Sequence, residues 1–184
     1  MMPCVLPSGL SGLLRRFRRE GDGVSAVEFA LVLPLLLSLY IGSMEVSQGI
    51  AADRKVTLMA RTVADLASQV SSITNGDMNN LLNASAAVIQ PYPASALKIT
   101  VSSVVIDAQG KATIAWSDTR NGTARSPGAA VSLPTALLVP NTSLIWGEAE
   151  YTYTPAVGYV VTGPLALKDQ IYMRPRLSAT VART

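Results

Sequence analysis

The sequence predicts an α+β protein in which a long N-terminal helix packs on a small antiparallel sheet. Three observations carry this prediction. An apolar run occupies residues 24–44, and a helical repeat of apolar residues continues beyond it to about residue 74. After residue 97, β-branched runs dominate instead. The chain has 184 residues, which is enough for one modest domain and an appendage but not for two full-sized cores.

The first segment, residues 1–23, is a basic leader, and the second, residues 24–44, is long enough to cross a membrane. From Val24 to Met44 there are 21 residues. At about 1.5 Å per residue they span roughly 30 Å, the thickness of a bilayer's hydrocarbon core. Positive charge in the leader keeps the N-terminus cytoplasmic and sends the rest of the chain across the membrane. The leader's arginines are Arg15, Arg16, Arg18 and Arg19.

Residues 45–74 continue the helix in amphipathic form. Their apolar side chains recur every three or four positions and so share one helical face: Val56, Met59, Val63, Leu66 and Val70. Asn75-Gly76 is a stop signal. Residues 75–97 then hold a linker and a short helix from Met78 to about Gln90, which is ended by the prolines that follow it.

Residues 98–184 read as a β-rich head. A hairpin is predicted from Leu97–Ile106 and Ala112–Trp116, because β-branched residues fill both runs and a polar turn ending in Gly110 joins them. Further strands are predicted at Ser143–Tyr153, where polar and apolar residues alternate, and at Gln170–Val181.

Composition argues against most enzyme classes. The chain has no histidine, which removes Ser-His and Cys-His nucleophilic sites and the commonest ligand of catalytic zinc. A single cysteine, Cys4, excludes an intrachain disulfide and a cysteine metal cluster. The net charge is only +3, with no basic stripe that interleaves with aromatics, so nucleic acid is not an expected partner. We expect a protein that is not an enzyme and that has no cofactor and no metal.

Glu28 is the unusual residue of the apolar run. An ionised carboxylate inside a bilayer costs several kcal/mol unless something compensates it. A cut after Gly23 would make Val24 the new N-terminus and leave Glu28 one helical turn from a free α-amine. That amine is largely protonated near neutral pH, so Glu28 would pair with it or with the amine of a neighbouring subunit. Cleavage after Gly21 is the alternative.

This arrangement resembles the type IV prepilin signature, in which a basic leader ends in glycine and a glutamate follows five residues later. Residues 26–31 (AVEFAL), which include Phe29, together with Pro34 resemble more specifically the TadE-like family of tight-adherence (Tad) pilus proteins. The chain also ends in a similar way to that family, with Arg174, Pro175 and Arg176 after an aromatic residue. We interpret Phe29 and Pro34 as helix-packing positions, and the Arg-Pro-Arg element as a family feature or a solvated edge strand.

The resemblance implies a pilin-like fold and a structural role as a minor pilin or pseudopilin. It implies cleavage by a prepilin peptidase at Gly23-Val24, a single pass through the bacterial inner membrane, and a periplasmic head. The partners it implies are membrane lipid, other Tad pilins and pseudopilins, and inner-membrane Tad platform proteins. Two alternatives remain: a secreted or signal-anchored binding domain, for which Gly49-Ile50-Ala51 is a late cleavage candidate, and a membrane-anchored hydrolase.

Overall fold

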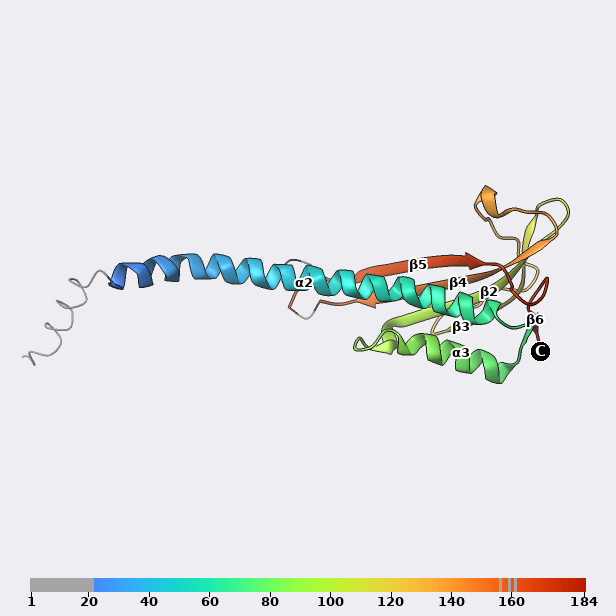
Figure 1. Cartoon of the computed structure of the whole chain (residues 1–184), viewed down its shortest axis with the longest axis horizontal. Helices are drawn as coiled ribbons and strands as arrows, with labels where there is room; N and C mark the ends of the chain where they lie inside the picture. Colours follow the sequence, from blue (N-terminus) through green and yellow to red (C-terminus); the bar gives the residue numbers. More distant parts are fainter. Residues whose placement is uncertain (1–21, 156, 159, 161) are drawn as a thin grey trace, which may run out of the picture. The chain divides into compact units, whose positions relative to one another are not determined.

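The computed structural model describes residues 22–155, 157, 158, 160 and 162–184. The chain divides into two compact units between Met44 and Glu45. One long helix, α2 (Asp22–Ser68), contributes to both units, and the remaining elements belong to the second. Figure 1 shows the chain with labels on α2, α3 and the strands β2 to β6. The α+β prediction, a long N-terminal helix with a small antiparallel sheet, is confirmed.

The head is built on a four-stranded antiparallel sheet with the order β3-β2-β4-β5. Its strands are β2 (Leu97–Ile106), β3 (Ala112–Arg120), β4 (Thr142–Tyr153) and β5 (Leu165–Met173). A second, two-stranded sheet pairs β1 (Ser72–Ile73) with β6 (Ala182–Arg183) in parallel. Short 3₁₀ turns at Ala94–Ala96 and Thr135–Leu137 complete the head.

The main core lies between the sheet and two helices, the 45–68 part of α2 and α3 (Asn75–Ala87). On β4 the odd-numbered residues face this core, because side chains alternate between the two faces of a strand. Gly147 is one of these odd-numbered residues, and the lack of a side chain there lets α2 approach closely. The buried stripe of α2 is largely made of small residues: Ala52, Val56, Met59, Ala60, Val63, Ala64 and Ala67.

A smaller core covers part of the opposite face of the sheet. Even-numbered residues of β4, Leu144 and Trp146, pack there with Val104 and Ile106 of β2 and with Leu133 from the segment between β3 and β4. The rest of this face carries polar and charged side chains. The sheet therefore has one fully covered face and one that is only partly covered.

The helices differ from the expectation at their ends. Helix α2 ends at Ser68 rather than near residue 74, so Val70 lies outside it, and Leu66 lies on an exposed face. Asn75 and Gly76, which we read as a stop signal, are the first residues of α3. A capping box explains this start: the Thr74 side chain accepts from the Asp77 N–H (3.2 Å), and Asp77 accepts from the Thr74 N–H (3.2 Å).

The first hairpin is confirmed, and β2 has the predicted bounds, whereas β3 continues beyond the predicted end at Trp116 to Arg120. The last predicted strand, Gln170–Val181, is wrong in its extent. The chain is already paired with β4 from Leu165, and it leaves the sheet after Met173, just before Arg174 and Pro175. Proline has no N–H to give to a ladder, which is consistent with the strand ending there.

Candidate assembly region

The predicted processing residues lie in the first turns of α2. Gly23 and Val24 are both helical, and Val24 is 61% exposed. Val24 and Glu28 are four positions apart in one helix, so their side chains are neighbours on one face. The alternative cleavage position, Gly21, and the arginines of the leader lie outside the described residues.

Glu28 is exposed on α2, and its neighbours in the sequence are exposed apolar side chains, including Val27 and Phe29. Within the part of the chain that the structure describes, its carboxylate has no hydrogen-bond or ion-pair partner. Helix α2 meets the criteria of length and apolarity for a membrane span, and none of its most apolar window is buried within the protein. Its apolar part, residues 24–44, therefore fits a single-pass membrane anchor, and Glu28 is the one carboxylate within that part.

Pro34 lies within α2, and the helix continues through it. Because proline lacks an N–H, the carbonyl of Ala30 has no donor four residues later. The hydroxyl of Ser38, one turn further on, donates to the Pro34 carbonyl (2.8 Å). Phe29 and Pro34 are both exposed in the single chain, as packing positions for another helix would be.

The Arg-Pro-Arg element lies at the other end of α2. The backbone N–H of Arg176 donates to the carbonyl of Ser68, the last helical residue (2.9 Å). The guanidinium of Arg176 forms an ion pair with Asp65, one turn earlier. Arg176 is exposed, as a solvated arginine would be, and its backbone N–H also satisfies a helix-end carbonyl. The element lies after the end of β5, so the interpretation as part of an edge strand is wrong. Arg174 is exposed.

Comparison with known proteins bears on α2. Residues 23–65 match the family model described as TadE-like protein. This segment is TadE-like. The match begins at Gly23 and includes Val24, Glu28, Phe29 and Pro34, so these residues lie in a segment that is similar to TadE-like proteins. No curated protein and no solved structure matches the chain.

The TadE-like segment ends at Asp65, the residue that binds Arg176. Beyond Arg176 the tail is fixed by further long-range bonds. The indole N–H of Trp116 on β3 donates to the Val181 carbonyl (2.7 Å). Arg183 of β6 donates to Asp118 on β3 (2.9 Å), and this bond raises the pKa of the arginine above its usual value. The sequence analysis did not predict these contacts, because residues 177–184 contain no local pattern that indicates a long-range partner.

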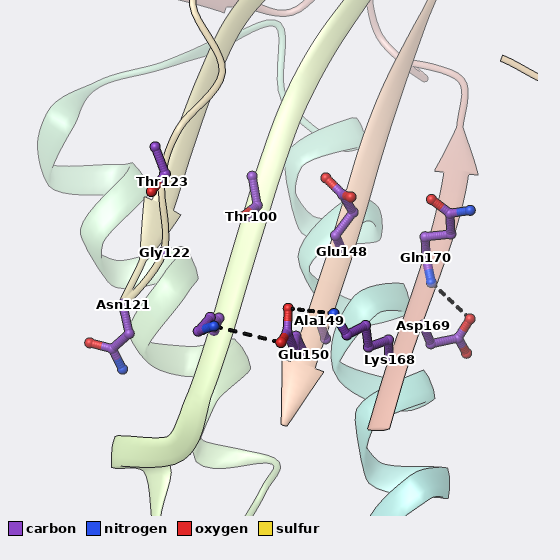
Figure 2. Close-up of a pocket in the computed structure, with 11 residues that line it drawn as sticks. Thr100, Asn121, Gly122, Thr123, Glu148, Ala149, Glu150, Lys168, Asp169 and Gln170 are labelled. Atoms are coloured by element: carbon purple, nitrogen blue, oxygen red, sulfur yellow. Dashed lines mark hydrogen bonds and ion pairs between the residues drawn. The ribbon is translucent and has the colours of Figure 1, made fainter. Parts of the chain in front are cut away.

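The partly covered face of the sheet carries an open polar groove, shown in Figure 2. Glu150 of β4 lies between two lysines, Lys168 of β5 (3.2 Å) and Lys98 of β2 (3.6 Å). The hydrogen bond from Lys168 holds the pKa of the Glu150 carboxyl below its usual value. Arg125 forms a bidentate pair with Glu148 nearby and lies over the Trp146 ring, 3.9 Å from its centroid.

Most of these charged side chains are paired with one another. The groove is therefore lined by surface ion pairs. Among the described residues, no group of three or more His, Cys, Asp or Glu side chains is placed to hold a metal. Sequence alternation placed Glu148 and Glu150 on one face of their strand, but it did not indicate their partners. The region with the clearest functional signal is therefore the TadE-like helix rather than this groove.

Proposed function

We propose that this protein is a minor pilin or pseudopilin of a Tad (type IVc) pilus and secretion machine, with a structural role in pilus assembly, adhesion and biofilm formation. One observation supports this most strongly. Glu28 is an exposed carboxylate five positions after Gly23, in a TadE-like helix that has no other charged residue until Glu45. A plain membrane anchor has no use for that charge.

Cleavage by a prepilin peptidase between Gly23 and Val24 gives the Glu28 carboxylate, which is otherwise unfavourable in the membrane, an amine to pair with. The new α-amine of Val24 lies one helical turn from Glu28, on the same face. Either this amine or that of a neighbouring subunit pairs with the carboxylate inside the membrane, where water screens the attraction little. Exposed Phe29 and the Pro34 region then pack against the helices of other Tad pilins and pseudopilins.

The same proposal fixes topology and partners. The basic leader keeps the N-terminus cytoplasmic, where the peptidase acts, and the head from residue 45 onward is periplasmic. Inner-membrane platform proteins of the Tad machine and membrane lipid surround the helix before it leaves for the fibre. The protein works without a cofactor and is not an enzyme.

The mature N-terminus tests this proposal. Mass spectrometry of the membrane-extracted protein, from cells with and without the prepilin peptidase, is expected to give a peptidase-dependent start at Val24. A peptidase-dependent start at Asp22 would move the cut to Gly21 and keep the pathway. A start near Ala52, or an uncut chain in both strains, would contradict the proposal and favour a signal-anchored binding domain.

A second measurement separates processing from assembly. Glu28→Ala is expected to be cleaved normally but to be lost from sheared pilus fractions, because the carboxylate acts only after the amine has been released. Ser25→Ala, an exposed change in the same turn, is the matched control and should be cleaved and assembled. Equal recovery of both variants in the pilus fraction would refute the role of Glu28.

A further inference from the structure

Glu45 occupies an unusual position at the start of the head. It follows Met44 directly and is the only charged residue between Glu28 and Asp53. The residue is 5% exposed, and its carboxylate accepts a hydrogen bond from the backbone N–H of Val160 (2.8 Å). Buried carboxylates need such partners. The connection between β4 and β5, to which Val160 belongs, is thus held at the point where α2 enters the head.

Neighbouring contacts fix the same end of the head against α2. The hydroxyl of Tyr92 donates to the carbonyl of Gln48 (3.1 Å), and the Tyr92 ring packs edge-on against Tyr153, the last residue of β4 (5.9 Å between centroids). Tyr153 also lies close to Gly49, since a Cβ on that glycine would be 3.9 Å from the ring. The segment that follows β4 therefore starts beside the first turns of α2 in the head.

Residues 44–52 and 151–167, which make most of these contacts, carry no charge apart from Glu45. Between Tyr151 and Leu167 the sequence has no Asp, Glu, Lys or Arg. Five apolar side chains here are between 43% and 67% exposed, and we call them the collar: Val46, Ile50, Val157, Val160 and Leu165. Exposed apolar side chains of this kind are disfavoured in water.

We propose that the collar lies in the interfacial layer of the membrane, where it contacts lipid. This inference rests on membrane anchoring and not on the Tad role. From Phe29 to Ala52 the chain has 24 residues whose only charge is the buried Glu45. At about 1.5 Å per residue they extend roughly 36 Å, which exceeds a hydrocarbon core of about 30 Å and enters the headgroup layer.

The burial of Glu45 explains why the helix can extend into the headgroup layer despite carrying a charge there. An exposed carboxylate at that depth would be unfavourable, but the bond to Val160 supplies a donor and the head covers the charge. The chain presents apolar side chains to the lipid and keeps its one charge inward. Apart from the buried Glu45, the uncharged sequence of the span continues to Ala52, and this continuity favours lipid over a second copy of the chain as the occupant of the collar.

Depth-dependent quenching tests the inference on the full chain in phosphatidylcholine–phosphatidylglycerol vesicles. In a Cys4→Ser background, the probe NBD is attached through Val157→Cys. Leu177→Cys is the matched control, because the two native side chains are 67% and 71% exposed and Leu177 follows the element bound to the far end of α2. Leu36→Cys, within the span, reports anchoring.

We expect nitroxide-labelled lipid to quench the probe at position 157 several times more than at position 177, with a blue-shifted emission only at 157. If iodide quenched the probe at position 157 as strongly as at position 177, while lipid still quenched position 36, the proposed lipid contact of the collar would be overturned. Membrane anchoring would remain supported. A blue shift that grows with protein density and is not quenched by lipid would replace lipid by a second copy. Loss of lipid quenching at position 36 would overturn both the anchoring and the inference.

Discussion

Gly147 sets how closely α2 approaches the sheet, and Gly147→Ala tests that reading. The residue pairs with Val101 of β2 and Ile171 of β5, so it lies in the middle of the sheet. A Cβ at this position would meet the carbonyl oxygen of Ala60 at 2.5 Å and the Cβ of Ala64 at 2.8 Å. Both neighbours belong to the rigid helix, so neither can rotate away.

The size of the effect follows from these distances. Ordinary contact begins near 3.4 Å, so the new methyl group is too close by 3.4 − 2.5 = 0.9 Å to one atom and by 3.4 − 2.8 = 0.6 Å to the other. Either the helix shifts or the strand bends, and overpacking of this kind costs about 1–3 kcal/mol. Alanine also reduces the conformational entropy of the unfolded chain, which offsets about 0.4–1 kcal/mol, so the expected net loss in the free energy of unfolding is about 0–2.6 kcal/mol, centred on about 1.3 kcal/mol.

Urea unfolding of the full chain in detergent micelles measures this loss. Trp116 and Trp146 both lie in the sheet, so their fluorescence reports the head rather than the anchor. Gly76→Ala is the matched control. A Cβ there meets only Thr74 Oγ1, at 3.8 Å, and alanine in a helix is expected to gain a few tenths of a kcal/mol. If both variants changed the free energy of unfolding equally, or in the same direction, close packing at Gly147 would be refuted.

Three further predictions concern the ion pairs and the tail. Arg176→Ala should lower the free energy of unfolding by about 0.2–1 kcal/mol through its surface ion pair, whereas Arg174→Ala should have no measurable effect; equal urea midpoints would contradict this. The pKa of Glu150 is lowered by folding, so its contribution is present above its unfolded value, near 4.5, and is lost as pH falls through the folded value. Glu150→Gln should flatten this part of the pH–stability curve, and an unchanged curve would exclude the pair as its cause. Trp116→Phe should cost about 1–3 kcal/mol because it leaves the Val181 carbonyl without its donor, which thermal unfolding against wild type can check.

Local patterns predicted the elements whose stability is decided locally. The hairpin of β2 and β3 is an example, because the turn carries its own chemistry. Asp107 Oδ1 accepts from the N–H groups of Gln109 (2.9 Å) and Lys111 (2.8 Å), and Gly110 has a positive φ of 79°. A β-branched run before such a turn is enough to place β2. The apolar segment and the unusual position of Glu28 within it could also be predicted, since the local composition alone defines them.

Elements decided by distant partners were not predicted. The start of β5 at Leu165 depends on pairing with Tyr153 of β4, and the intervening residues carry no strong strand pattern. The start of α3 shows a different failure. Asn75-Gly76 is a local stop signal, but the capping box of Thr74 and Asp77 outweighs it. The bond between Glu45 and Val160 joins residues 115 positions apart, so no local pattern could predict it.

The Arg-Pro-Arg element follows the last strand of the sheet and contacts the end of α2. Pro175 cannot continue the β5 ladder, so the chain turns out of the sheet after Met173. The next residue then offers its N–H to Ser68 and its guanidinium to Asp65, the last residue of the TadE-like match. A cation is also the favoured charge at a helix C-terminus. The element therefore contacts the C-terminal end of α2 through Arg176, and these contacts make it part of the packing around that helix end.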